Sequence, residues 1–144
     1  MTLSIIIRVI SLWDIGRKKP VYSISPAHGA NIETSESEGE IETPHWITAI
    51  ASLRYSDLFV SGSWDGFIRF WKISEDNKNF SQIAQVPVAG VVNSIDIKTV
   101  FPSNRTVVVV GVGQEMKAGR WLRLKKGVKN CTKIIELPEF NTKK

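Results

Sequence analysis

The sequence predicts an all-β fold, and three observations lead to this prediction. No segment sustains the hydrophobic periodicity of an amphipathic helix, whereas short alternating runs recur along the chain. Three of these runs are centred on tryptophan, at Trp13, Trp71 and Trp121. The Asp65-Gly66 pair lies between two alternating runs, a placement typical of a tight hairpin turn. Together these features favour strands joined by turns.

The composition is that of a globular protein that folds in water. The chain has 144 residues, of which 42% are hydrophobic and 23% charged. Because no apolar run approaches the roughly 20 residues that span a bilayer, we expect no membrane association. The apolar start, residues 1–10, lacks a signal-peptide cleavage site and is interrupted by Arg8, so we interpret it as a strand. The single Cys131 excludes an internal disulfide and is interpreted as a packing residue.

The stretch from Ser61 to Trp71 carries the most informative local pattern. Ser61-Gly-Ser63 ends one run, Asp65-Gly66 supplies the turn, and Phe67 to Ile73 forms the return strand. Alternation divides the return strand into two faces, with Ile68, Phe70 and Lys72 on one and Phe67, Arg69, Trp71 and Ile73 on the other. The stretch resembles a WD repeat, with Trp71-Lys72 where Trp-Asp is usual. This resemblance implies a β-propeller of four-stranded blades.

The spacing of the tryptophans requires insertions between the repeats. They are 58 and 50 residues apart, whereas WD repeats recur roughly every 40–45 residues. The first insertion is acidic: residues 30–43 contain five Glu among Ser and Thr, and we expect a disordered loop. The expected organisation is the end of a partial blade (1–24), a loop with the acidic insertion (25–45), a complete blade (46–86), a degenerate last blade (88–137) and a basic tail (138–144). In the last blade, Arg120 to Lys125 and Lys133 to Leu137 are the expected third and fourth strands.

The WD resemblance also implies a buried structural hydrogen-bond network. Its expected members are Ser61, Asp65 and Trp71, with His28 as the fourth and His45 as the competing candidate. A serine-hydrolase interpretation of Ser, His and Asp is weaker, because the Gly-x-Ser-x-Gly nucleophile turn is missing and a hairpin follows Ser61. The sequence shows no His/Cys metal cluster and no phosphate loop, so we expect no catalytic residue, metal or cofactor.

Positive charge is concentrated towards the C-terminus. The chain carries a net charge of +5, and residues 116–144 hold nine Lys or Arg against two Glu. The candidate RNA-binding residues are Arg17, Lys18, Lys19, Arg120, Arg123, Lys125 and Lys126. The alternative is that Arg69, Arg120 and Arg123 pack along strand faces with their charges in water. Trp64, at the hairpin turn, is a candidate to contact a base or a partner protein, or else to cover its own hairpin.

A more specific resemblance lies near the C-terminus. The block Gly111-Val-Gly-Gln-Glu115, followed by Gly119-Arg-Trp121, resembles the last repeat of the 55-kDa WD-repeat family of the U3 small nucleolar ribonucleoprotein. Further matching segments are Lys19-Pro20, Ala27-His28-Gly29, Trp46-Ile47-Thr48 and Asn93-Ser94-Ile95. The resemblance implies a seven-bladed propeller, of which this chain supplies the last two and a half blades. It also implies binding of U3 small nucleolar RNA with box C/D particle proteins, within a pre-ribosomal particle in the nucleolus, during small-subunit rRNA processing.

The start of the chain departs from this family pattern. Residues 1–9 lack the Ser-x-Asp-Gly expected before Trp13, so we expect a C-terminal fragment whose first nine residues do not belong to the fold. Such a fragment would leave an apolar blade face open and be marginally stable or self-associating. The sequence predicts a non-enzymatic scaffold that binds RNA. The alternative is a generic WD-repeat protein-interaction module, with residues 33–42 as its docking segment, or a non-functional fragment of one.

Overall fold

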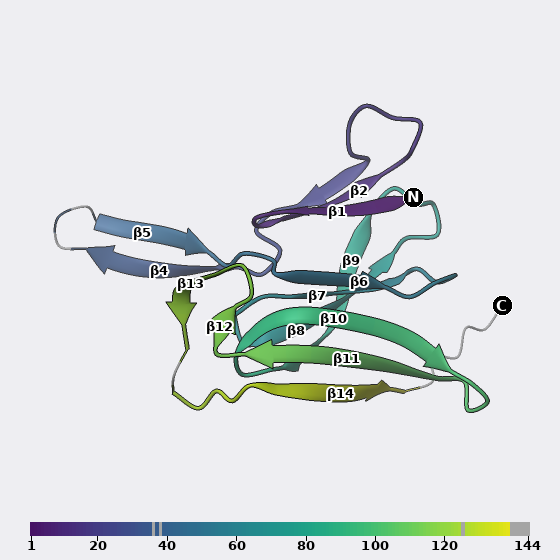
Figure 1. Ribbon diagram of the computed structural model, residues 1–144. Coiled ribbons are helices and arrows are strands. Elements are labelled where there is room, and N and C mark those ends of the chain that lie inside the picture. The colour runs from purple at the N-terminus through teal and green to yellow at the C-terminus, as the bar shows by residue number, and fades with distance from the viewer. Residues whose placement is uncertain (36, 38, 125, 139–144) are drawn as a thin grey trace.

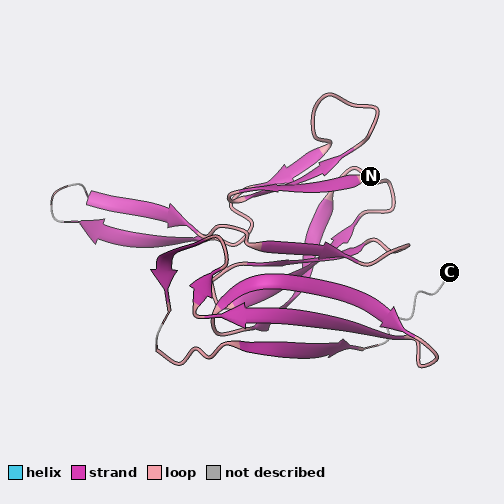
Figure 2. Cartoon of the chain, viewed as in Figure 1, coloured by secondary structure: helices cyan, strands magenta, loops and turns pink. Residues whose placement is uncertain are grey.

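The computed structural model describes residues 1–35, 37, 39–124 and 126–138. Every regular element in this described part is a strand, which confirms the all-β prediction (Figure 2). The strands are β1 (Thr2–Ile6), β2 (Val9–Trp13), β3 (Tyr22–Ile24), β4 (Ala30–Ser35), β5 (Gly39–Pro44), β6 (Ala49–Ser52), β7 (Leu58–Gly62), β8 (Phe67–Ile73), β9 (Phe80–Pro87), β10 (Val91–Val100), β11 (Arg105–Gly113), β12 (Glu115–Met116), β13 (Gly119–Arg123) and β14 (Cys131–Leu137).

Three antiparallel sheets follow one another along the chain. The first sheet has the order β1-β2-β3, the central sheet β6-β7-β8-β9 and the last sheet β10-β11-β14. Two further hairpins, β4–β5 and β12–β13, pair only within themselves. Figure 1 shows both hairpins at one side of the molecule, which we call the hairpin end. The chain therefore builds successive sheets and extends two hairpins from a common end.

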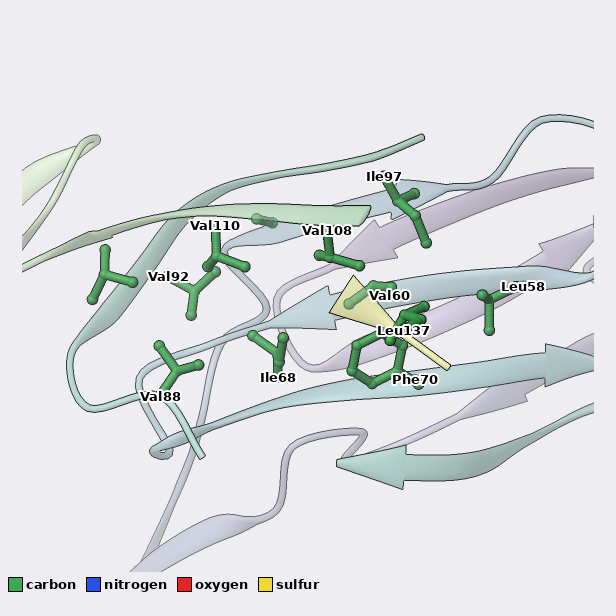
Figure 3. Close-up of a cluster of buried hydrophobic side chains, with 12 residues drawn as sticks. Leu58, Val60, Ile68, Phe70, Val88, Val92, Ile97, Val108, Val110 and Leu137 are labelled. Atoms are coloured by element: carbon green, nitrogen blue, oxygen red, sulfur yellow. The ribbon is translucent and has the colours of Figure 1, made fainter. Parts of the chain in front are cut away.

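The central sheet is packed on both of its faces. Towards the first sheet, Phe59 and Trp71 join a cluster that includes Ile10 and Leu12. Towards the last sheet, side chains such as Val60 contact a second cluster, which Figure 3 shows in close-up. The alternation predicted for the return strand is confirmed, because Ile68 and Phe70 belong to the second cluster whereas Trp71 and Ile73 belong to the first.

The backbone of the central sheet comes very close to the last sheet at Gly62. A Cβ atom at this position would lie 2.3 Å from Val92 Cγ1 and 2.7 Å from Val92 Cβ. Both distances are far below van der Waals contact, so no larger residue fits without a shift of the two sheets. The second glycine of the central hairpin, Gly66, instead serves the turn, where its φ of 88° is one that glycine tolerates.

The acidic segment forms a hairpin, so the predicted disordered loop at residues 30–43 is wrong. β4 and β5 pair in antiparallel register along their full length, and the hairpin projects away from the sheets (Figure 1). Ile32 pairs with Glu42 and Thr34 pairs with Glu40, so glutamates do not stand directly opposite one another. The composition favoured disorder, but the alternating β-branched residues and the separation of like charges permit a strand pair.

The last sheet also differs from the expectation. Trp121 lies in β13, which pairs with β12 in a separate hairpin, and β14 takes the place beside β11. The predicted third strand, Arg120 to Lys125, is therefore wrong, as is the expected equivalence of Trp121 with Trp13 and Trp71. The physical reason is burial: β14 packs Leu137 into the core beside β11, whereas β13 carries arginines that favour solvent.

The first residues belong to the first sheet, so the prediction that residues 1–9 lie outside the fold is wrong. β1 pairs with β2 along its whole length, and Leu3 packs against the buried cluster between the first and central sheets. Trp13 Nε1 donates a hydrogen bond of 2.8 Å to Ser4 Oγ. The turn needs no Asp-Gly pair, because Ile7 adopts the left-handed conformation with a φ of 52°.

Candidate functional site

The turn between β7 and β8 places Asp65 next to the core. The backbone N–H of Phe67 donates to Asp65 Oδ1 at 3.2 Å, which is the local bond that makes Asp a common turn residue. Gly66 supplies the positive φ that this turn requires. As a result, the second carboxylate oxygen of Asp65 points inwards, and its side chain is only 5% exposed.

Four side chains from three parts of the chain, Asp65 included, follow one another in a series of hydrogen bonds that ends at this carboxylate. His28 Nδ1 lies 3.0 Å from Asp65 Oδ2, and His28 Nε2 lies 2.7 Å from Ser61 Oγ. Trp71 Nε1 donates to the same Ser61 Oγ at 2.8 Å. The structure thus joins His28, Ser61, Asp65 and Trp71 in one chain of hydrogen bonds, which links the β3–β4 connection to the central sheet. His45, the competing histidine, lies outside this network.

One arrangement of protons satisfies every group in the network. Trp71 donates to the Ser61 oxygen, the Ser61 hydroxyl donates to His28 Nε2, and His28 Nδ1–H donates to Asp65. Burial raises the pKa of the Asp65 carboxyl, but hydrogen bonds from His28, Arg69 and the Phe67 backbone outweigh burial and lower that pKa below its usual value. We therefore describe Asp65 as the ionised end of the network.

Arg69 is a member of this site that the sequence did not single out. Its Nη2 donates to Asp65 Oδ2 at 2.9 Å, so the carboxylate receives a second donor, and this donor carries a positive charge. Arg69 lies in β8, four residues after Asp65, and its side chain reaches back to the turn that precedes this strand. The alternation of β8 had placed Arg69 on the same face as Trp71, and that is the signal that could have identified it.

The hydrogen bonds from Ser61 to His28 and from His28 to Asp65 resemble those of a hydrolytic triad, but these side chains are not accessible to a substrate. Ser61 is fully buried, and its oxygen already accepts a hydrogen bond from Trp71 Nε1. The His28 side chain is likewise inaccessible to solvent. A nucleophile must approach a substrate atom, so this arrangement is suited to holding strands together rather than to acyl transfer.

The first sheet repeats one part of this arrangement. Trp13 pairs with Thr2 in the ladder and donates to Ser4, two residues further on. Trp71 likewise pairs with Phe59 and donates to Ser61. Ser4 lacks a sequence signal because no Asp-Gly turn follows it, although it lies nine residues before Trp13, close to the ten residues between Ser61 and Trp71.

Trp64, the candidate contact at the hairpin turn, is half-buried. Its ring meets that of His45 edge-on, at a centroid distance of 5.9 Å, and lies 6.2 Å from that of Trp46. Trp46 is the more accessible partner, with 39% of its surface exposed. The three rings form a small aromatic cluster near the base of the β4–β5 hairpin, and the sequence had identified only Trp64 as a candidate contact.

The structure separates the candidate cations into two groups. Arg17, Lys18 and Lys19 lie in the β2–β3 connection, at the end of the first sheet opposite its β1–β2 turn (Figure 1). The β12–β13 hairpin follows β11 at the hairpin end. Its Arg123 contacts Glu115 at 3.1 Å, and Lys126 beyond it is exposed. Lys125 and the side chain of Arg120 lie outside the described residues.

Three amide side chains fix the base of the β12–β13 hairpin. Asn93 Nδ2 donates to the Glu115 carbonyl at 2.8 Å, and the Lys117 N–H donates to Asn93 Oδ1 at 2.9 Å. Gln114 is held from both sides, because its N–H donates to Asn130 Oδ1 at 2.9 Å and its Nε2 donates to a backbone carbonyl. The hairpin is therefore held in place by the last sheet and the segment before β14.

Two other kinds of feature are missing from the described part of the chain. Nothing in it forms a helix long and apolar enough to cross a bilayer. Among the described residues, no group of three or more His, Cys, Asp or Glu side chains is placed to hold a metal ion. Cys131 is exposed rather than packed, which corrects its interpretation as a buried residue.

The chain is similar to curated WD-repeat proteins over most of its length. It is 34% identical to an uncharacterised WD repeat-containing protein of Schizosaccharomyces pombe, over 90% of this chain and 28% of the relative. It is 33% identical to human U3 small nucleolar RNA-interacting protein 2, over 89% of this chain and 25% of the relative. Ribosomal RNA-processing protein 9 of Saccharomyces cerevisiae is 29% identical over 84% of this chain and 24% of the relative. No protein-family model matches.

Solved structures agree with these matches. The structure of U3-55K aligns with a TM-score of 0.77 and 32% identity, over 90% of this chain and 37% of that one. The crystal structure of RRP9 WD40 repeats gives the same TM-score over 36% of its chain. The chain is therefore part of a WD-repeat β-propeller. It belongs to the 55-kDa WD-repeat family of the U3 small nucleolar ribonucleoprotein, which confirms the resemblance seen in the sequence. The chain spans about a quarter of the length of the curated relatives that it matches.

Proposed function

We propose that the chain is a non-enzymatic scaffold that binds RNA as part of a U3 small nucleolar ribonucleoprotein. It would act with U3 RNA and box C/D proteins in a pre-ribosomal particle, during small-subunit rRNA processing in the nucleolus. The names of its relatives, which refer to U3 RNA and to ribosomal RNA processing, support this proposal. Because this chain matches only about a quarter of those relatives, extending their function to this segment is part of the proposal.

The β12–β13 hairpin is the observation that carries the RNA-binding part of the proposal. It extends from the hairpin end, its base is fixed by amide hydrogen bonds, and Lys117, Arg123 and Lys126 accompany it. A cationic element that is already ordered loses little entropy on binding. Such residues contact phosphates and position RNA without reading its sequence. The second group, Arg17 to Lys19, is a smaller phosphate contact in this proposal.

The buried network supports the non-enzymatic part. His28, Ser61 and Asp65 are the only described residues in which the sequence suggested hydrolytic chemistry, and their side chains are enclosed. We infer that their role is to fix the β3–β4 connection and the central hairpin against each other. If the network is structural, RNA and partner proteins would bind at the turns and hairpins of the hairpin end.

Salt dependence of RNA binding tests the proposal. The triple variant Arg120→Ala, Arg123→Ala, Lys126→Ala should weaken binding on all RNA sequences, and each lost phosphate contact should reduce the slope of log affinity against log salt by roughly 0.7 to 0.9. The variant Arg17→Ala, Lys18→Ala, Lys19→Ala removes the same charge from the smaller contact, so it should reduce the slope less than the hairpin variant does. An unchanged slope in the hairpin variant would contradict the assignment, and equal effects in both variants would indicate a response to net charge alone.

A second function, protein docking, is favoured by the β4–β5 hairpin. This hairpin projects from the sheets, and Ile32, which pairs with Glu42, is 67% exposed (Figure 1). Trp46 and Trp64 lie near its base and would add an aromatic contact for the same partner. Replacing residues 30–43 by a short Gly-Ser linker should abolish co-purification of a protein partner and leave RNA affinity unchanged. Loss of RNA affinity in that variant would instead favour a role of the acidic hairpin in the RNA site.

A further inference from the structure

A polar hollow lies at the base of the β12–β13 hairpin. It has a volume of about 410 Å³, and its lining includes Asn93, Gln114, Glu115, Arg123 and Asn130. This volume lies within the range of pockets that hold small ligands. The lining is dominated by amide and charged side chains rather than by apolar ones, so a ligand in this hollow would be held by hydrogen bonds.

The amides that line the hollow are not fully used. Both the nitrogen and the oxygen of the Asn93 side-chain amide are hydrogen-bonded to the hairpin backbone. Gln114 Nε2 donates to the Val128 carbonyl and Asn130 Oδ1 accepts from the Gln114 N–H. Within the described part of the chain, Gln114 Oε1 and Asn130 Nδ2 have no hydrogen-bond partner, so one acceptor and one donor remain beside the hollow.

A second hollow adjoins the first and is cationic. It has a volume of about 500 Å³ and shares Gln114 with the first hollow, and its lining includes Lys129 and Lys133. The first hollow offers donors and acceptors, the second is lined in part by two lysines, and Gln114 lines both. In the first hollow, the single carboxylate, Glu115, is already paired with Arg123.

We propose that this pair of hollows binds one unpaired nucleotide of an RNA, an inference that rests on the proposed RNA-binding function. The edge of a nucleobase presents donors and acceptors side by side, which the free ends of Gln114 and Asn130 match. The Arg123 guanidinium offers a plane for stacking. The phosphate of the nucleotide lies over Lys129 and Lys133. A peptide would satisfy the amides equally well, but the surrounding positive charge favours a phosphate-bearing ligand.

The test compares a blunt RNA duplex with the same duplex carrying one unpaired nucleotide, made in four versions with each base. The full chain should bind at least one unpaired version about tenfold more tightly than the blunt duplex, a ratio ordinary for one hydrogen-bonded base. The variant Asn130→Asp keeps the acceptor for the Gln114 N–H but removes the free donor, so the ratio should fall to about one. Thr132→Asp adds the same charge outside the lining of either hollow and should keep the ratio.

The possible results separate the inference from the function on which it rests. If the unaltered chain binds all duplexes equally and in a salt-dependent manner, the nucleotide site is overturned and the RNA-binding function stands. A ratio that survives in Asn130→Asp also overturns the site. Binding to none of the RNAs overturns both and leaves the hollow to a peptide ligand. Thermal melting of both variants controls for loss of folding.

Discussion

The central sheet is covered on both faces, whereas the last sheet is covered on one. In the central sheet Ser61 is fully buried and Trp71 is 3% exposed. In the last sheet, Val108 and Val110 are buried against the central sheet, but Val109 is 38% and Ile134 is 72% exposed on the other face. The central sheet is thus stabilised by packing against a neighbouring sheet on each face, whereas the last sheet is stabilised by packing on one face only.

The difference teaches where polar side chains are placed in such sheets. In the central sheet, Ser61, Asp65 and Trp71 are joined with His28 in one hydrogen-bonded network, because unsatisfied groups in these buried positions would destabilise the fold. On the last sheet the polar groups form exposed ion pairs, such as Asp96 with Lys98 at 2.9 Å and Arg105 with Glu136 at 2.8 Å. Exposed pairs of this kind contribute little. Mutations in the two sheets should therefore differ in their effects.

The largest expected effect comes from removing the carboxylate of the network. Asp65→Ala leaves His28 and Arg69 without their acceptor in a buried site, and we expect a loss of about 3 kcal/mol in unfolding free energy. Asp96→Ala, on the open face of the last sheet, should leave the urea midpoint unchanged. Chemical denaturation measures both, and equal destabilisation by the two variants would contradict the comparison.

A smaller effect is expected from steric contact at the two glycines. Gly62→Ala would place its Cβ 2.3 Å from Val92 inside the interface of two sheets, and overpacking of this kind costs about 2 kcal/mol. At Gly111 an added Cβ would meet Ser94 Oγ at 2.4 Å, but Ser94 is exposed and can rotate away. Thermal melting should lower the Tm of Gly62→Ala clearly more than that of Gly111→Ala. The reverse order would show that the two sheets do not pack as described.

The two tryptophan–serine pairs sharpen the comparison with the first sheet. Trp71→Phe leaves Ser61 without its donor in a fully buried site, and about 1.5 kcal/mol should be lost. Trp13→Phe breaks the bond to Ser4 in a partly buried site, where water can replace the donor, so a smaller loss is expected. Both are measured by urea unfolding with matched buffers. An equal loss would mean that burial does not distinguish the first sheet from the central one.

The smallest effect is a pH dependence. Since the hydrogen bonds to Asp65 outweigh its burial and lower its pKa in the folded chain, its carboxylate stabilises the fold above the usual carboxyl pKa near about 4. That stabilisation disappears as the pH falls through the lower folded pKa. The difference in unfolding free energy between the unaltered chain and Asp65→Asn should therefore be constant near neutral pH and shrink in acid. A difference that grows in acid would contradict the direction of the shift.

The central hairpin could be predicted from the sequence because its signals are local. The Asp-Gly turn and the alternation of Phe67 to Ile73 depend on neighbouring residues only. The position of β14 could not be predicted, because Trp121 and the run Lys133 to Leu137 compete for the same place beside β11. That competition is decided by burial against another sheet. The β4–β5 hairpin was missed because glutamate content was given more weight than cross-strand pairing.

The site could be predicted only in part, because some of its residues lie in a recognisable sequence pattern and others do not. The WD resemblance suggested His28, Ser61, Asp65 and Trp71, and the structure brings these side chains within hydrogen-bond distance of one another. The amides at the base of the β12–β13 hairpin had no recognisable sequence signal. Asn93 lies more than twenty residues from the hairpin that it holds, and only the tertiary fold brings it there.

Exchange of the indole N–H protons measures most directly whether the sheets are held as described. In an NMR hydrogen-exchange experiment, the Trp71 indole N–H should exchange only when the whole chain unfolds, because it is buried and bonded to Ser61. The Trp13 indole N–H, in the partly covered first sheet, should exchange faster. Exchange of Trp71 as fast as that of Trp13 would contradict a central sheet enclosed by its two neighbours.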